Sequence, residues 1–262
     1  MIIYSMDYPF SFKALLDGGL LIVISLAVMA LSGAVALIFV KSIKVDKLAE
    51  NIFVFSIFFS NFTFMGIPII FAIYGKEGIF YTSIFIVVIR LLFNTLGIMV
   101  MQRGSITPKK RNPGNILNPP IIAVLAGIII FTFSIHIPKP VSLFLGSLAA
   151  TMTPFGTIIV GLQLAEENFA GMFNDYRVYL VSFIRLVLLP LITYSGLKMF
   201  QLNPMIVGIP VVITAMPVAA SVAMLADKFN GNTYLGSQCV FISTILAIFT
   251  IPFIVLLVTR VS

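Results

Sequence analysis

Long apolar runs alternate with short polar segments along the whole chain. Because about 20 apolar residues cross the hydrocarbon core of a bilayer as a helix, this pattern predicts membrane-spanning helices. Eight runs are long enough, and they cover residues 18–40, 51–74, 78–102, 116–136, 141–165, 176–200, 205–228 and 234–259. The longest connection, QRGSITPKKRNPGN at 102–115, is rich in Pro, Gly and positive charge, and it marks the midpoint of the chain.

The composition supports the same interpretation. Of the 262 residues, 60% are hydrophobic and only 10% are charged, and the mean hydropathy is +1.14. A soluble domain has about 45–50% apolar residues, and a soluble fold with so little charge could not cover its surface. The sequence therefore predicts an all-α polytopic membrane protein whose outer surface faces the lipid bilayer.

Positive residues gather on one side of the predicted bundle. If the helices alternate in direction, the loops at 41–50, 102–115, 166–176 and 228–233 share a side, which carries nine Lys and Arg residues against five on the other. Positive loops stay in the cytoplasm, so we predict a multi-pass protein of the cell inner membrane, with a cytoplasmic 102–115 loop and both termini external. These loops also explain the net charge of +7, so no nucleic-acid partner is expected.

Two segments share an interrupted pattern. Residues 51–78 read NIFVFSIFFSNFTFMGIPIIFAIYGKEG, and residues 205–232 read MIVGIPVVITAMPVAASVAMLADKFNGN. In each, an apolar half-span reaches a Met that is followed by Pro, then a second half-span and a polar turn. The two units start five helices apart, so alternate crossing gives them opposite orientations. Broken helices at matching positions of inverted repeats point to a transporter's binding site near the membrane midplane.

The two prolines, Pro68 and Pro217, explain how such a break is used. A proline in a helix interior costs about 3 kcal/mol, and the backbone groups that it frees have no water in lipid. A proline suits the first turn of a helix, so each predicts a second half-helix that starts in mid-membrane. Two helix N-termini that converge there would bind an anion such as a carboxylate. A pair of ordinary proline kinks is the alternative.

Several polar residues lie near these breaks or inside other spans. Arg90 and Arg185 are charges within spans, and no Asp or Glu lies in the interior of any span to pair with them. Each therefore needs either the carbonyls at the ends of the first half-helices or an anionic substrate. Asn94 follows Arg90 by one helical turn. The predicted substrate-binding set is Asn61, Thr63, Gly66, Pro68, Arg90, Asn94, Arg185, Met216, Pro217 and Ser221.

The sequence contains no signature of an enzyme. HExxH, GxSxG and phosphate-binding glycine loops are all missing, and His136 and Cys239 are the single His and Cys. We therefore expect no catalytic activity, no metal and no cofactor. A coupling ion, H⁺ or Na⁺, is not identified. The interior of the spans contains no carboxylate that would carry it, but Na⁺ held by carbonyls and amides stays open.

Five stretches resemble the auxin efflux carrier family: FSNFTFMGIPII, NPPIIAVLAGIII, MTPFGTIIVGLQLA, AMPVAASVAMLA and STILAIFTIPFIV. The resemblance covers about residues 18–259. It implies two inverted five-helix repeats whose broken helices cross at prolines corresponding to Pro68 and Pro217. It also implies that small organic anions bind at the crossing and that Asn61 contacts them.

The sequence departs from this pattern at its front, where three predicted helices precede the linker instead of five. The resemblance implies that the first two family helices are absent. The expected division is an N-terminal segment (1–17), an incomplete three-helix repeat (18–102), the linker (103–115) and a five-helix repeat (116–262). Lipid or a second protomer, as in a homodimer, should then cover an apolar surface beside the fourth and fifth helices.

Two functions follow from these patterns. The first is a secondary transporter, of the efflux carrier type, that moves small organic anions by alternating access at the crossing. The alternative is a non-transporting, truncated membrane subunit or remnant of such a carrier.

Overall fold

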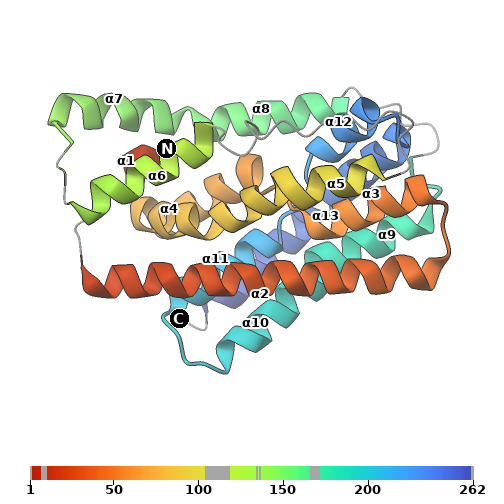
Figure 1. Cartoon of the computed structure of the whole chain (residues 1–262), viewed down its shortest axis with the longest axis horizontal. Coiled ribbons are helices and arrows are strands. Elements are labelled where there is room, and N and C mark those ends of the chain that lie inside the picture. Colours follow the sequence, from red (N-terminus) through yellow and green to blue (C-terminus); the bar gives the residue numbers. More distant parts are fainter. Residues whose placement is uncertain are drawn as a thin grey trace.

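The computed structural model describes residues 2–6, 11–103, 119–133, 135, 137–165 and 172–260, and within these residues every regular element is a helix. Figure 1 shows an elongated bundle, with α2 (Phe12–Ile43) along one side and α7 (Lys139–Ala150) and α8 (Met152–Ala165) along the opposite side. The other helices are α1 (Ile2–Met6), α3 (Lys47–Phe58), α4 (Ile67–Leu92), α5 (Ile98–Gln102), α6 (Pro119–Thr132), α9 (Tyr176–Phe183), α10 (Leu189–Lys198), α11 (Pro204–Thr214), α12 (Ser221–Lys228) and α13 (Thr233–Thr259). Three π-helical turns complete the described part: η1 (Phe62–Gly66), η2 (Phe93–Gly97) and η4 (Ile184–Leu188).

Short polar side chains begin many of these helices. In each case the side-chain oxygen accepts a hydrogen bond from a backbone N–H of the first turn, which satisfies a donor that the helix cannot pair. The caps are Ser11 for α2, Asp46 for α3, Asp175 for α9, Asn203 for α11 and Asn232 for α13. Asp175 also pairs with Arg177 at 2.6 Å, and these hydrogen bonds hold the pKa of Asp175 below its usual value.

Four helical stretches are long and apolar enough to cross a membrane. They are Phe12–Ile43, Phe62–Gln102, Tyr176–Lys198 and Thr233–Thr259. Three of them match the predicted helices at 18–40, 176–200 and 234–259, although α2 begins at Phe12, within the predicted N-terminal segment. The other predicted spans are divided into shorter helices or end next to residues outside the described part. The number of eight crossings stays a prediction.

The stretch from Phe62 to Gln102 is divided at Gly75. This residue has φ +60° and ψ −148°, which is not a helical conformation and is readily adopted only by glycine. The division falls between the predicted helices at 51–74 and 78–102, as expected from the sequence. Residues 104–115 of the predicted linker lie outside the described residues, as does His136.

The π-helical turns were not predicted from the sequence. Pro68 follows η1 by two residues, and Pro190 follows η4 by two residues. A proline has no N–H for the carbonyl four residues before it, and its ring crowds that carbonyl. The wider π turn accommodates both effects. Such turns are frequent at functional sites, and all three described turns carry residues around the crossing of the two broken helices.

A proline also divides the predicted helix at 141–165. Pro154 gives no hydrogen bond to the Ala150 carbonyl, and α7 and α8 meet at Thr151. Helices α6, α7 and α8 expose large apolar side chains: Ile122, Leu125, Ile129, Leu143, Phe144, Phe155, Ile158 and Leu162. Helix α1 packs against α6 and α7. Whether the exposed side chains form the surface for a missing helix pair stays a prediction.

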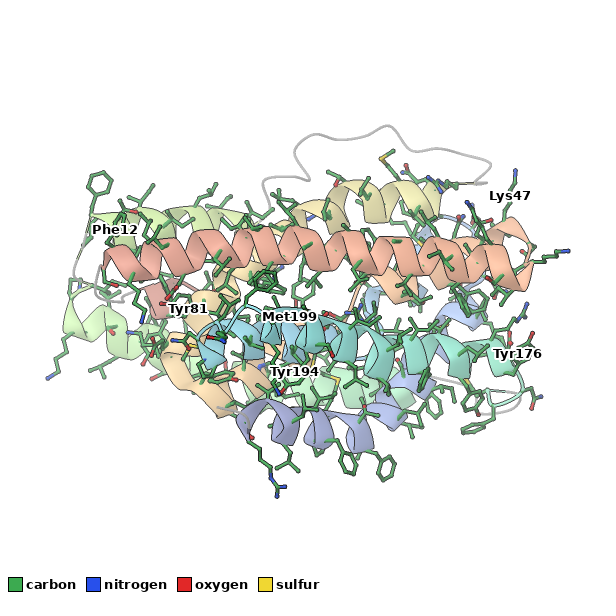
Figure 2. All side chains as sticks on the ribbon, turned by 90° about the horizontal axis from the view of Figure 1, so that it is seen from below. Phe12, Lys47, Tyr81, Tyr176, Tyr194 and Met199 are labelled. Atoms are coloured by element: carbon green, nitrogen blue, oxygen red, sulfur yellow. The ribbon has the colours of Figure 1, made fainter. Side chains whose placement is uncertain are left out.

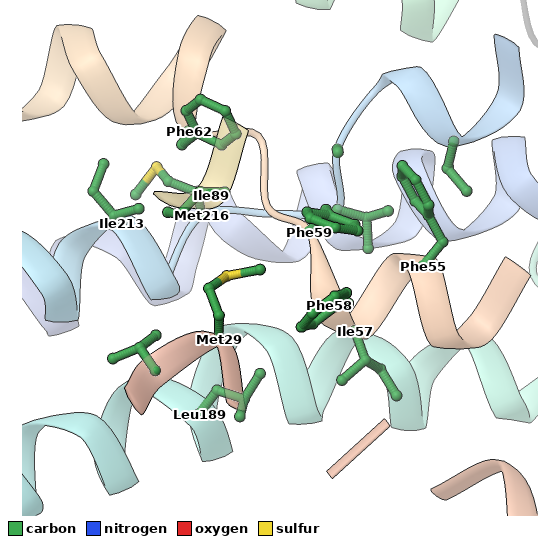
Figure 3. Close-up of a cluster of buried hydrophobic side chains, with 14 of the residues drawn as sticks. Met29, Phe55, Ile57, Phe58, Phe59, Phe62, Ile89, Leu189, Ile213 and Met216 are labelled. Atoms are coloured by element: carbon green, nitrogen blue, oxygen red, sulfur yellow. The ribbon is translucent and has the colours of Figure 1, made fainter. Parts of the chain in front are cut away.

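Phenylalanine side chains fill the core where the broken helices cross. The Phe59 ring lies 4.9 Å from that of Phe55 and 5.2 Å from that of Phe93, measured between ring centroids. Figure 3 shows Phe58 and Phe59 on one side of the crossing, and Phe62 and Met216 on the other. Apolar groups therefore pack on both sides of the crossing, so protein partners for the polar groups that the break frees come from the crossing itself.

The ends of the described chain lie toward one end of the bundle. Helix α1 and the C-terminal end of α13 are close to the N and C marks of Figure 1. Phe12 and Lys47 mark the two opposite ends of the long axis in Figure 2. The number of crossings and the placing of both termini on one side of the membrane stay predictions. Which side is cytoplasmic stays a prediction.

Candidate functional site

The two interrupted helices meet as a short antiparallel pair. Ser60 and Val218 form an isolated β-bridge. The Asn61 N–H donates to the Pro217 carbonyl (2.8 Å), and the Ala219 N–H donates to the Phe59 carbonyl (3.1 Å). Each break thus satisfies backbone groups of the other, as buried backbone groups require. The crossing joins segments more than 150 positions apart in the sequence, as the Ser60 Oγ to Ile213 carbonyl bond also shows (3.0 Å, separation 153).

The first interruption does not lie at Pro68, and that part of the prediction is wrong. Helix α3 ends at Phe58 and η1 begins at Phe62, so the non-helical residues are 59–61. Pro68 lies inside the second half-helix, one π turn later. Asn61, rather than the proline, begins this half-helix, because its side-chain oxygen accepts from the Phe64 N–H at 3.3 Å. At Pro217 the interruption falls as predicted, between α11 and α12.

Gly66 permits the close contact between the two units. A Cβ at this position would lie 2.8 Å from Ile213 Cδ1 and 3.3 Å from Met216 Cγ. Figure 3 shows Ile213 and Met216 near Phe62, the first residue of the π turn η1. Met216 is fully buried. Gly66 and Met216 therefore shape the crossing and do not line the cavity described next.

A cavity of about 280 Å³ opens where the two second half-helices begin. Its wall comes from both breaks and from the last turns of α4 with η2. The residues that line it are Ser60, Asn61, Phe62, Thr63, Phe64, Arg90, Phe93, Asn94, Ala219, Ala220, Ser221 and Met224. The described part of the lining contains one charged side chain, that of Arg90, and several hydroxyl and amide groups.

Unpaired backbone donors gather at this cavity. Helix α12 begins after Ala220 and has no side-chain cap, unlike the helices capped by Ser, Asp or Asn. Among the described residues, no acceptor is recorded for the N–H groups of Phe62, Thr63, Ala220 and Ser221. Such donors at a helix start need water or a ligand. The positive ends of two helix dipoles also face the cavity.

Arg90 supplies the full charge of the site. Its Nη2 lies 3.4 Å from Thr63 Oγ1, and its guanidinium lies 5.2 Å from the centre of the Phe62 ring. Its Nε is buried and has no acceptor in the described part of the chain. Asn94 donates its side-chain N–H to the Arg90 carbonyl at 2.9 Å, which fixes this amide beside the arginine. The half-buried Arg90 guanidinium therefore makes few contacts with polar groups of the protein.

Arg185 is placed differently. It is only 3% exposed and does not line the cavity. Its Nη1 donates to the Ile57 carbonyl (2.8 Å), and its Nε donates to the Met216 carbonyl (3.3 Å). These carbonyls belong to the ends of the first half-helices, the acceptors that the sequence offered as an alternative to a substrate. We therefore propose no contact between Arg185 and a substrate.

The structure brings together half of the predicted set at the cavity: Asn61, Thr63, Arg90, Asn94 and Ser221. The other half, Gly66, Pro68, Arg185, Met216 and Pro217, lies in or behind the crossing. Sequence reasoning missed Ser60 and the apolar wall of Phe62, Phe64, Phe93 and Met224. Their apolar character resembles that of any span residue, and only Ser60, next to Asn61, carried a polar signal.

Comparison with known proteins was made for the whole chain. The family model described as "Membrane transport protein" matches residues 9–255. A protein of Methanothermobacter thermautotrophicus described as an uncharacterized transporter is 25% identical over 253 residues, which make up 96% of this chain and 82% of the relative. The match runs through both interruptions and the cavity between them.

Proposed function

The chain belongs to the membrane transport protein family, and from that premise we propose that it is a secondary transporter that moves small organic anions through the cavity at the crossing. The family and the uncharacterized transporter to which the chain is similar support a role in transport. The identity of the cargo as an anion comes from the charge and donors of the cavity.

The observation that carries this proposal is the uncapped start of α12 beside Arg90. Each helix start contributes roughly +0.5 of a charge, so the two starts and the arginine together place about +2 at the cavity. Among the described residues that line the cavity there is no Asp or Glu. A carboxylate would accept hydrogen bonds from the free N–H groups and from the guanidinium at once.

We propose that the anion crosses the membrane by alternating access. We propose eight crossings in all. This count takes each of three divided helices as one crossing: α3 with η1 and the start of α4, α7 with α8, and α11 with α12. We propose that the two broken helices form an inverted pair that carries the anion, and that α6, α7 and α8 belong to the scaffold. Lipid or a second protomer would cover the apolar face of α6–α8.

A thermal-shift screen of small organic acids on purified protein tests the proposal. A ligand that binds only the folded protein stabilises it by about 2.7 kcal/mol at 100 times its Kd. We expect at least one carboxylate to raise the unfolding temperature, and its uncharged amide to have no effect. If every acid tested behaves like its amide, the cavity does not recognise an anionic group.

Replacing Asn61 with Ala should weaken binding of that acid without unfolding the protein. Asn61 is only 5% exposed, and among the described residues its Nδ2 has no recorded acceptor, so it is free to donate to the ligand. The loss of one net hydrogen bond, about 0.5–1.5 kcal/mol, corresponds to an increase in Kd of about 2- to 13-fold. Isothermal titration measures the change. Asn203→Ala, which removes the cap of α11 outside the cavity, is the control. An unchanged Kd in folded Asn61→Ala would contradict the contact.

The orientation is tested by labelling an introduced cysteine. The native Cys239 is buried, so it gives little background. With Lys109→Cys in the 102–115 loop, a membrane-impermeant maleimide added to intact cells should not react until the cells are opened, because the nine-to-five charge bias places this loop inside. Strong labelling of intact cells would mean that the orientation is the reverse.

A further inference from the structure

Arg185 joins the two broken helices and is not part of the cavity lining. It lies in η4, on a helix separate from both. One guanidinium reaches the Ile57 carbonyl at the end of α3 and the Met216 carbonyl just after α11. Among the described residues, Arg185 forms no ion pair with a carboxylate; the ion pair there joins Arg177 to Asp175. The partners of the Arg185 cation are backbone carbonyls.

The C-terminal ends of two helices set the electrostatic environment of the Arg185 guanidinium. A helix C-terminus carries roughly −0.5 of a charge, so the ends of α3 and α11 together present about −1 inside the bundle. Carbonyl oxygens that converge in this way are ligands for a hard monovalent cation. The single positive charge of Arg185 matches the pair of helix ends in size and sign, and its planar donors reach both.

We propose that the crossing contains a site for a monovalent cation and that the chain fills it with its own Arg185. The protein therefore needs no free Na⁺ at this position for the crossing to hold together. The inference also deepens the proposed function, on which this part rests: by cancelling the negative helix ends, Arg185 keeps the neighbouring anion cavity positive.

Emptying the site is the direct test. Arg185→Ala removes the cation and leaves the carbonyls, so this variant should unfold at a lower temperature than the wild type. Methylguanidinium at low millimolar concentration should raise its unfolding temperature progressively, and Na⁺ should do so more weakly. The wild type should unfold at one temperature in Na⁺, K⁺ and N-methylglucamine chlorides of equal ionic strength. Arg260→Ala, at the exposed end of α13, is the control and should not respond to methylguanidinium.

Two outcomes would overturn the proposal. One is a folded Arg185→Ala whose unfolding temperature is the same in every cation, and the other is a wild type that Na⁺ stabilises more than N-methylglucamine at equal ionic strength. The second measurement decides the matter even if Arg185→Ala does not fold. Neither depends on transport, so a failure of the anion screen leaves the cation result intact, and the reverse also holds.

Discussion

Replacing Arg90 with Gln is expected to weaken the binding of an organic anion by about 10- to 150-fold, because a hydrogen bond to a charged group contributes about 1.5–3 kcal/mol. Arg90 is the charged side chain of the cavity lining. Its contacts with Thr63 and the Phe62 ring are long, so the charge of Arg90 contributes little to interactions within the protein. Isothermal titration of purified protein measures the change.

The controls separate charge from packing. Arg90→Lys keeps the charge and loses the planar fork, so its Kd should lie between those of the wild type and Arg90→Gln. Arg260→Gln makes the same exchange at the exposed end of α13 and should bind like the wild type. Equal affinity in folded Arg90→Gln and in the wild type would mean that the cavity does not hold the anion.

A methyl group at position 156 should destabilise the protein by about 1–3 kcal/mol, the usual range for overpacking a tight contact. Helix α8 packs against η1, and a Cβ on Gly156 would lie 2.8 Å from the Phe64 carbonyl oxygen. That carbonyl lies four residues before Pro68 and receives no hydrogen bond from it. Because the neighbour is backbone, Gly156→Ala must push α8 away from the crossing. Thermal unfolding in detergent should show a lower midpoint.

Gly161→Ala provides the matched control on the same helix. No atom lies within 4 Å of a Cβ built at Gly161. Alanine is favoured over glycine in a helix interior by about 1 kcal/mol, so this variant should be as stable as the wild type or more stable. If Gly156→Ala were equally harmless, the close approach of α8 to the broken helix would not be required for the fold.

The sequence predicted the helical segments well and the details of the first break poorly. Apolar length alone located α2, α9 with α10, and α13, because a span of about 20 residues leaves a strong pattern. It placed the first interruption at Pro68, yet the non-helical residues are 59–61. A proline signals that a helix is disturbed, but a π turn can absorb the disturbance, and the hydrogen bonds with Pro217 and Ala219 decide where the backbone leaves the helix.

The site was predicted in part for a similar reason. Polar residues in apolar spans are costly, so Asn61, Arg90 and Asn94 stood out and do line the cavity. The same rule also selected Arg185, whose partners are backbone carbonyls of two distant helices. Those carbonyls and the free N–H groups at Ala220 and Ser221 cannot be predicted from the sequence, because backbone groups are common to nearly all residues. Only the crossing of the two helices reveals them.

Uptake of a radiolabelled organic acid into proteoliposomes tests the central claim most directly. The acid is the one that gives the largest thermal shift, and vesicles with the wild type are compared with vesicles that contain Arg90→Gln or no protein. We expect uptake that saturates with the wild type and that drops sharply with Arg90→Gln. Uptake by the wild type no faster than by empty vesicles, with folded protein and a confirmed thermal shift, would contradict transport and favour a membrane subunit that binds the anion without moving it.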